Sequence, residues 1–408
     1  MRDQLLAYLE NQHDHVLELQ RGMTAIPAIG PDNQGDGEAQ KALFLRREIM
    51  KLGIAAGEII QINANDDRVS SGLRPNLAVR WPGKTPRTLW VIGHMDVVPP
   101  GDLALWESPP FELRQDGDII IGRGVEDNQQ AIACGMLVLR ALTQLKAEPD
   151  LSYGLLLVSD EETHSQYGLR HVIEAAPDLV KPDDLVLIPD IGDPFGKEIE
   201  IAEKSCIWLK VTITGKQCHA SRPDEGINTL MASSAAVLAL QELYTAFPQR
   251  DELFKPPHST FAPSKKEANV ENINTIPGLD VFYVDCRVLP GLDLEQIARK
   301  AETIVTEAVK RHGAGARVEA VYTEQAPAPT AMDSPVVRRL ARSLAKLRGL
   351  EARPIGVGGQ TVAAVLRAKG IPTAAWSTII GNAHTPNEKS SLINTIADAK
   401  VVADMLFD

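Results

Sequence analysis

The segment Tyr153-Gly154-Leu155-Leu156-Leu157-Val158-Ser159-Asp160-Glu161-Glu162 joins an apolar run to three consecutive acids. An unbroken apolar run of this length is typical of a parallel strand that is buried on both faces of a sheet. In open α/β sheets, ligands bind outside the carboxyl ends of the strands, which is where these acids fall. The segment therefore predicts an α/β fold with a candidate cation site at the end of this strand. A solvated acidic turn would give the same local pattern.

Other apolar runs also end at polar side chains. The run 88–93 leads to His94 and Asp96, an H-x-D pair in which the imidazole can bind a metal while the carboxylate holds its second nitrogen. The remaining runs are 119–121 before Gly122–Asp127, 185–188 before Asp190, and 374–377 before the loop that carries His384. Asp127 alone could cap the helix predicted over 129–142, and Asp190 alone could be a turn acid. Together they predict a two-metal hydrolytic site with nitrogen and oxygen ligands.

Length and composition set further limits. A chain of 408 residues exceeds the usual size of one core, so two domains are expected, and 44% hydrophobic with 24% charged residues is typical of a globular protein. The net charge of -12 argues against nucleic acid or an anionic membrane as a partner. No apolar run reaches the ~18 residues of a membrane span. The start, 1–10, predicts an amphipathic helix rather than a signal peptide.

The four cysteines, Cys134, Cys206, Cys218 and Cys286, are scattered and form no C-x-x-C pair. Most of them lie in apolar contexts, which is typical of buried, reduced thiols. We therefore expect a cytoplasmic protein. Cys218 lies next to His219, but adjacent residues in an extended segment point to opposite faces, so a Cys-His nucleophilic pair is not expected.

Five motifs occur along the chain in the order that characterises one family. They are Gly93–Pro99 (GHMDVVP), Gly122–Asp127 (GRGVED), Asp160–Glu162 (DEE), Gly215–Ser221 (GKQCHAS) and Ala383–Glu388 (AHTPNE). The chain thereby resembles the co-catalytic metallopeptidase and deacylase family of acetylornithine deacetylase, succinyl-diaminopimelate desuccinylase, aminoacylase and glutamate carboxypeptidase. The resemblance runs from the turn at 26–30 to the last predicted helix, so it covers nearly the whole chain.

The resemblance implies two divalent metal ions, zinc first, with cobalt or manganese as alternatives. The implied ligands are His94 and Asp190 for one ion, Glu162 and His384 for the other, and Asp127 as the bridge between them. We also expect a cis Asp127–Asn128 peptide bond, because Asp127 needs a sharp turn to aim both oxygens at two ions.

The resemblance also implies a mechanism of amide hydrolysis. Glu161 would be the general base that takes a proton from metal-activated water and passes it to the departing nitrogen. Asp96 would hold the second nitrogen of His94 and so fix its tautomer, a role that the H-x-D spacing suggests independently. The chain is therefore expected to be a metal-dependent hydrolase of a small substrate.

The region 205–324 follows a different order of elements. Its patterns predict a strand at 206–214, a helix at 227–247, a strand near Glu271–Thr275, a strand at 278–288, a helix at 294–311 and a strand at 316–322. This β-α-β-β-α-β order is that of a ferredoxin-like α+β module. Since Asp190 precedes the module and His384 follows it, we expect a discontinuous catalytic domain, 1–204 and 325–408, with a mostly parallel central sheet and a module inserted at 205–324.

Four residues outside the ligand set complete the expected site. From sequence alone, His219 could be a surface loop residue, Asn274 a turn former before Pro277, and Arg287 a solvent-facing strand residue. The resemblance implies instead that His219 crosses a homodimer interface to stabilise the developing oxyanion, while Asn274 and Arg287 grip the substrate. Gly359, in the glycine-rich loop 356–361, would contact the substrate through its backbone. The insert is accordingly expected to be the dimerisation domain.

The substrate itself is left open by the sequence. Val362 stands where many relatives carry an acid, and Gln129-Gln130 stand where many carry Lys-Gly, so an N-acyl amino acid and a short peptide remain alternatives. The protein could be an N-deacylase or a dipeptidase or carboxypeptidase. A non-catalytic family member is disfavoured because every ligand and the base are present. A nucleotide-binding dehydrogenase is disfavoured because Gly122-x-Gly124 lacks the third glycine of that motif.

Overall fold

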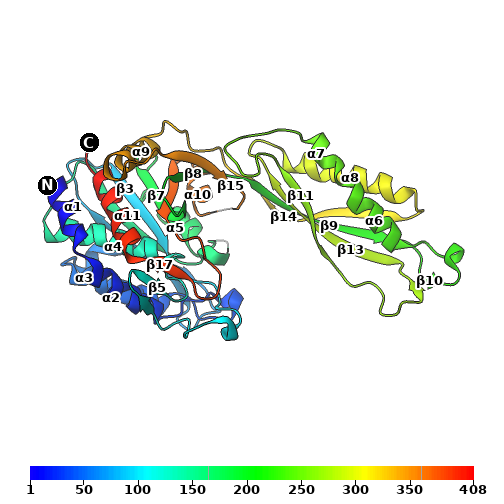
Figure 1. Ribbon diagram of the computed structural model, residues 1–408, viewed down its shortest axis with the longest axis horizontal. Helices are drawn as coiled ribbons and strands as arrows, with labels where there is room; N and C mark the ends of the chain where they lie inside the picture. The colour runs from blue at the N-terminus through cyan, green and yellow to red at the C-terminus, as the bar shows by residue number, and fades with distance from the viewer. Residues whose placement is uncertain (164, 360) are drawn as a thin grey trace. The chain divides into compact units, whose positions relative to one another are not determined.

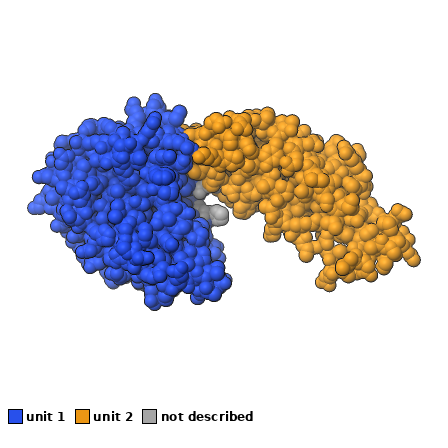
Figure 2. Space-filling view, viewed as in Figure 1, with its two compact units in different colours: residues 1–201, 330–355, 361–408 blue, residues 202–329, 356–360 orange. Residues whose placement is uncertain are grey.

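The computed structural model describes residues 1–163, 165–359 and 361–408 (Figure 1). The chain divides into two compact units (Figure 2). Unit 1 comprises residues 1–201, 330–355 and 361–408, and unit 2 comprises residues 202–329 and 356–360. The short segment 356–360 thus groups with unit 2, although it lies far along the chain from the insert expected at 205–324. No helix in the described residues is long and apolar enough to cross a membrane.

The central sheet has eight strands. In spatial order they are β1 (Ile60–Asn65), β2 (Leu73–Trp81), β6 (Ser152–Val158), β3 (Thr88–His94), β7 (Leu185–Asp193), β16 (Thr373–Thr378), β8 (Glu198–Glu203) and β15 (Arg353–Val357). The inner strands β6, β3, β7 and β16 are parallel, while β1 runs antiparallel to β2, β2 to β6, and β8 to β16. Every residue of β3 and β6 is buried, which explains their unbroken apolar sequences. The predicted α/β fold with a mostly parallel central sheet is confirmed.

Helices cover both faces of this sheet. They are α1 (Arg2–Glu10), α2 (His13–Thr24), α3 (Ala39–Lys51), α4 (Gln129–Gln144), α5 (Leu169–Ala175), α9 (Pro335–Arg348), α10 (Ala363–Arg367) and α11 (Leu392–Met405). Helix α4 approaches one face closely at Gly135, where a Cβ would lie 2.5 Å from Leu155 Cδ1. Helices α5 and α10 join a buried cluster with Trp90 and Ile92, which face the other side of β3.

A small sheet pairs the two loops that carry site residues. The predicted strand at 119–121 forms as β5 (Ile119–Ile121), but it lies outside the central sheet, between β17 (Lys389–Ser391) and β4 (Arg114–Asp116). Ile121 of β5 pairs with Lys389 of β17. This register brings the beginning of the Gly122–Asp127 segment beside the segment that follows His384.

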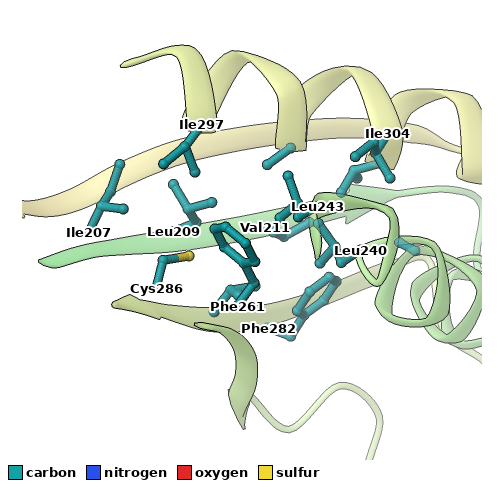
Figure 3. Close-up of a cluster of buried hydrophobic side chains, with 14 of the residues drawn as sticks. Ile207, Leu209, Val211, Leu240, Leu243, Phe261, Phe282, Cys286, Ile297 and Ile304 are labelled. Carbon is teal, nitrogen blue, oxygen red and sulfur yellow. The ribbon is translucent and has the colours of Figure 1, made fainter. Parts of the chain in front are cut away.

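Unit 2 contains a four-stranded antiparallel sheet in the order β11 (Thr260–Lys266), β13 (Leu279–Val288), β9 (Ser205–Thr214) and β14 (Gly315–Glu324). The helices α6 (Thr229–Ala239), α7 (Glu242–Ala246) and α8 (Leu294–Lys310) belong to the same unit. Figure 3 shows apolar side chains of these helices, among them Ile304, packed against those of the sheet, among them Leu209 and Phe282. The chain order of strands and helices is the ferredoxin-like one expected for the insert.

Two details of the insert differ from the sequence prediction. The strand predicted near Glu271–Thr275 was wrong, because the second strand of the sheet is β11, and Thr275–Ile276 (β12) pairs instead with Cys218–His219 (β10) in a small ribbon. Strand β11 lies at the sheet edge and carries a proline and two lysines, features of edge strands that obscure the usual strand pattern. The helix predicted at 227–247 is two helices, α6 and α7.

Candidate metal centre

The first group of site residues gathers at the carboxyl ends of β3 and β7. His94 is the last residue of β3 and Asp190 lies in the neighbouring parallel strand β7, so both side chains reach the same sheet edge. Asp127 comes from the loop before α4. His94 Nε2 lies 2.9 Å from Asp127 Oδ1 and 3.8 Å from Asp190 Oδ1. Ligand atoms of the three residues all lie within 4.8 Å of one another.

The second group shares Asp127 with the first. Glu162 follows β6, and His384 lies in the loop between β16 and β17. His384 Nε2 is 3.1 Å from Asp127 Oδ2 and 3.2 Å from Glu162 Oε2. The two oxygens of Asp127 therefore face different histidines. All five predicted ligands come together in unit 1, in two overlapping sets of three.

Glu161 lies beside both sets but belongs to neither. Its Oε2 is 3.9 Å from His94 Nε2. Its backbone N–H donates to Asp96 Oδ1 at 3.1 Å, and the N–H of Glu162 donates to Asp96 Oδ2 at 3.0 Å. The Asp96 carboxylate thus anchors the short turn that presents both glutamates.

Asp96 also contacts the His94 ring, mainly through its backbone. The Asp96 carbonyl oxygen lies 3.1 Å from His94 Nδ1, whereas the Asp96 carboxylate lies 3.5 Å from it. A carbonyl can only accept, so Nδ1 carries the proton and the Nε2 lone pair of the neutral ring faces the carboxylates. This is the tautomer that a metal ligand needs.

Proton affinities in this cluster are strongly perturbed. Burial, together with the neighbouring Asp190, Glu162 and Asp127 carboxylates, raises the pKa of Glu161 well above its usual value. Burial likewise raises the pKa of Glu162 to about 7. Hydrogen bonds to Asp127 and Glu162 raise the pKa of His384 to about 10.

The pKa values of His94 and Asp127, which both belong to the first set, shift in opposite directions. Burial disfavours the charged form of His94, but the carboxylates of Asp127, Asp190 and Asp96 outweigh burial and raise the pKa of His94 well above its usual value. Burial would also raise the pKa of Asp127, yet hydrogen bonds with His384 and His94 lower it. A buried cluster dominated by carboxylates thus stabilises positive charge in its midst.

The chemistry of this donor set fits divalent metal ions. Each set offers one imidazole nitrogen and two carboxylates, without thiolate, which suits zinc, cobalt or manganese. Three protein ligands per ion would also leave coordination positions for water and substrate, as catalytic rather than structural sites require.

Asp160, the first acid of the opening motif, serves the fold. It is buried and lies 3.5 Å from the Nη2 atom of Arg74, which also pairs with Glu38 and Asp66. Asp160 Oδ2 accepts a hydrogen bond from the Tyr167 N–H at 2.9 Å. Its counter-charge is therefore a buried arginine, and only the second and third acids of the motif face the candidate centre.

Residues that the sequence left unremarked support the ligands. Asn128 Oδ1 accepts from the His94 N–H at 3.1 Å, and Asn128 Nδ2 donates to Asp190 Oδ1 at 2.6 Å, so this amide ties two ligands together. The Asp127–Asn128 peptide bond is cis, as predicted. Glu126 and Glu388 are also buried at the centre's margin. Their position inside the quoted motifs was the available sequence signal.

The four remaining predicted site residues belong to unit 2. His219 is exposed on β10, and its Nδ1 accepts from the backbone N–H of Ser221 at 3.1 Å, so the neutral ring carries its proton on Nε2. Asn274 lies near it across the ribbon, where its carbonyl accepts from the Ala220 N–H at 2.8 Å. The structure therefore brings His219 and Asn274 close to each other.

Arg287 and the glycine-rich loop also meet in unit 2. Arg287 Nη1 donates to the Gly358 carbonyl at 3.2 Å, next to Gly359. The same guanidinium is held by Asp285 at 2.9 and 3.1 Å. Gln360, which the sequence places in this loop, lies outside the described residues.

The three departures from the common motifs lie in the interior. Val362 is buried in the apolar cluster with α5. Gln130 donates to Ser377 Oγ and accepts from Ser390 Oγ, so it braces both ends of the loop that carries His384. Gln129 accepts from Thr24. In the structure these side chains serve packing and loop support.

Known proteins share this sequence and fold. The model of Peptidase family M20/M25/M40 matches residues 90–408. The chain is 36% identical to an uncharacterized metallohydrolase of Methanococcus maripaludis, over 96% of this chain and 99% of that protein. It is 27% identical to a succinyl-diaminopimelate desuccinylase of Nitratiruptor, over 73% and 78% of the two chains. A tripeptidase structure from Staphylococcus aureus superposes with a TM-score of 0.74 at 16% identity, covering 97% of each chain, which shows the common fold. The chain belongs to the M20/M25/M40 peptidase family, and it is a metallohydrolase of the peptidase and deacylase type.

Proposed function

We propose that the protein hydrolyses an amide or peptide bond with two divalent metal ions, most suitably zinc. His94 and Asp190 would hold one ion, Glu162 and His384 the other, and Asp127 would bridge them. The observation that carries this proposal is the placement of the two Asp127 oxygens, 2.9 Å from His94 and 3.1 Å from His384. When bound, the ions would polarise the scissile carbonyl and lower the pKa of a water molecule.

Glu161 is proposed as the general base. Its carboxylate borders both ligand sets without belonging to either, and Asp96 fixes its backbone. A base in this position can accept the proton of the attacking water and deliver it to the leaving nitrogen. The raised pKa of Glu161, caused by burial and neighbouring carboxylates, suits a group that must both accept and release a proton near neutral pH.

The proposed substrate is a small N-acyl amino acid or a short peptide. A relative named as a desuccinylase favours deacylation, while a structural neighbour named as a tripeptidase favours peptide cleavage. Arg287, with Asn274 and the Gly359 backbone, would grip the substrate. A guanidinium suits a substrate carboxylate, and the hold of Asp285 on Arg287 keeps it oriented.

The cytoplasm is the proposed location. All four cysteines are free, and three of them are buried. Burial raises the pKa of the Cys206 thiol to about 11, which keeps it protonated and unreactive. Unpaired, protonated thiols are typical of a reducing compartment.

A metal titration combined with a substrate panel tests this function. Wild-type protein should hold two ions per chain, lose activity in a chelator, and regain it with zinc, cobalt or manganese. N-acetyl amino acids, N-succinyl amino acids and dipeptides would then distinguish a deacylase from a dipeptidase or carboxypeptidase. Chelator-resistant hydrolysis by the pure protein would contradict the metal mechanism, and no hydrolysis across the panel would favour a non-catalytic member.

We further propose a two-fold dimer formed by the insert, with His219 acting at the partner's metals. His219 lies in unit 2, whereas every proposed ligand lies in unit 1. Helix α6 exposes Leu230, Met231 and Leu238, apolar surface suited to an isologous interface. The Nε2–H that Ser221 leaves free could donate to the developing oxyanion.

Complementation between two inactive variants tests the shared site. Mixing His219→Ala with Glu161→Gln should produce heterodimers in which one site has its own Glu161 and the partner's His219. Such heterodimers should recover up to half of the wild-type activity. Subunit exchange without recovery would show that His219 acts within its own chain or not at all.

A further inference from the structure

Two buried carboxylates at the candidate centre have no part in the chemistry proposed above. Glu126 precedes the bridging Asp127, and Glu388 follows His384 by four residues. We propose that they are reciprocal positioning residues, each holding the loop that presents the other's neighbouring ligand. The inference deepens, and rests on, the proposed two-metal function.

Glu388 holds the loop that carries Asp127. One of its oxygens, Oε1, accepts from the backbone N–H groups of Glu126 at 2.9 Å and Asp127 at 3.0 Å. The other, Oε2, accepts from the Gly124 N–H at 2.9 Å and from Arg123 Nη1 at 2.8 Å. Glu388 is fully buried, so these four donors replace water around its carboxylate.

Glu126 holds the loop that carries His384. Its Oε1 accepts from the N–H groups of Gly381 and Asn382, each at 3.0 Å, and its Oε2 accepts from the Ile380 N–H. Glu126 is 5% exposed. Three consecutive backbone donors thus converge on one carboxylate just before the ligand His384.

The two sets of hydrogen bonds are linked, because Glu388 also accepts from the backbone N–H of Glu126 itself. Loosening either one lets the loop of Asp127 shift relative to the loop of His384. Asp127 Oδ2 and His384 Nε2 lie 3.1 Å apart, and both residues would hold the second ion. Such supporting contacts typically govern metal affinity by roughly 10–100-fold.

Glutamine replacement separates this role from general stability. In Glu126→Gln and Glu388→Gln, one acceptor oxygen becomes an NH2 group that must face backbone donors. Glu200→Gln is the matched control, because Glu200 is also fully buried and pairs with Arg367 at 2.7 Å, outside both ligand sets. All three variants remove a buried negative charge.

Hydrogen–deuterium exchange in a chelator measures how firmly the two carboxylates hold the backbone of these loops in the absence of metal. Glu126→Gln should speed exchange at residues 380–382 by about tenfold, and Glu388→Gln should do the same at residues 124–127. Glu200→Gln should leave both segments unchanged. Exchange that stays at the wild-type rate in folded variants, or that rises equally in the control, overturns the proposal.

Calorimetric titration of zinc into chelator-treated protein supplies the second readout. Glu126→Gln should weaken binding of the ion that His384 would hold by roughly 10–100-fold and leave the other nearly unchanged, whereas Glu388→Gln, which loosens the bridging Asp127, should weaken binding of both. Two unchanged affinities would overturn the positioning role. If wild-type protein bound fewer than two ions, the two-metal function would fail. The exchange experiment would still test whether Glu126 and Glu388 hold the two loops. A glutamine variant that does not fold is replaced by the corresponding aspartate variant, Glu126→Asp or Glu388→Asp, in both measurements.

Discussion

The proposed site residues of unit 1 and unit 2 are held in very different ways. In unit 1 His384 is exposed, but the other four ligands are buried or half-buried, and buried groups fix this region, as Asn128 fixes Asp190 and Asp96 fixes the turn at Glu161. In unit 2 His219 is exposed and bonds with its near neighbour Ser221. Metal ligands need a preformed geometry, whereas a group that meets substrate only during the reaction can be held loosely until then.

The comparison also shows how the two units are stabilised. Unit 2 encloses an apolar cluster between one sheet and its helices (Figure 3). Unit 1 buries charges as well, and each needs a partner, as Arg74 needs Glu38, Asp66 and Asp160. A buried charge that loses its partner is costly, whereas an exposed pair contributes little. Substitutions of the same chemical kind should therefore have unequal effects in the two units.

The largest expected effect concerns the proposed base. Glu161→Gln should lower kcat by roughly 10²–10⁴-fold while metal content stays near that of wild type, because the five ligands are untouched. Steady-state kinetics and elemental analysis of the same sample check this. Glu112→Gln, at an exposed glutamate of the same unit, is the control and should keep full activity. Retention of more than about a tenth of the activity by Glu161→Gln would remove Glu161 from the base role.

The next effect compares buried and exposed arginine pairs. Arg74→Met should reduce the free energy of unfolding by about 3–5 kcal/mol, because Glu38 and Asp160 would remain buried without their cation. Arg299→Met breaks an exposed ion pair with Glu295 on α8 and should change the free energy of unfolding by about 0.5 kcal/mol or less. Urea denaturation measures both. Equal losses would contradict the view that burial sets the cost.

Two tryptophans allow the same comparison with a neutral donor. Trp376 is fully buried and donates from Nε1 to the Gly196 carbonyl at 2.8 Å, so Trp376→Phe should cost about 1–3 kcal/mol. Trp208 is 40% exposed and donates to Asp285 at 2.9 Å, so Trp208→Phe should cost about 1 kcal/mol or less. Denaturation curves recorded under identical conditions compare them. A larger loss at Trp208 would reverse the expected order.

The last prediction concerns the pH dependence of stability in chelator-treated protein. The pKa of Glu162 is raised from 4.5 to about 7 on folding, so the folded state loses stability as pH rises through that interval. The pKa of His384 is raised from 6.5 to about 10, so its stabilisation is present below 6.5 and is lost toward 10. Both act in the same direction, so Tm should fall from pH 5 to pH 9. Metal-loaded protein should show a weaker fall, and a Tm that rises with pH in the chelator would contradict the assigned shifts.

Much of the metal centre could be predicted because ligands at strand ends leave local signals. A buried parallel strand is apolar throughout, so the polar residue that follows it, such as His94 after β3, is conspicuous. Edge strands carry weaker signals, which is why β11, with Pro263 and its lysines, escaped detection. The supporting roles of Asn128, Glu126 and Glu388 could not be predicted, because their hydrogen-bond partners lie far away in the sequence.

The sequence by itself determined the family, the α/β class, the insert and the identity of the candidate ligands, because apolar runs and short motifs are local properties of the chain. Only the tertiary structure decided how those residues meet. In the structure β5 pairs with β17 rather than joining the central sheet, and Asp160 forms an ion pair with Arg74. The Asp96 carboxylate accepts a hydrogen bond from the backbone N–H of Glu161. Each of these pairings joins groups distant in sequence, and a hydrogen bond or ion pair depends on where the folded chain brings its atoms, which a local pattern does not record.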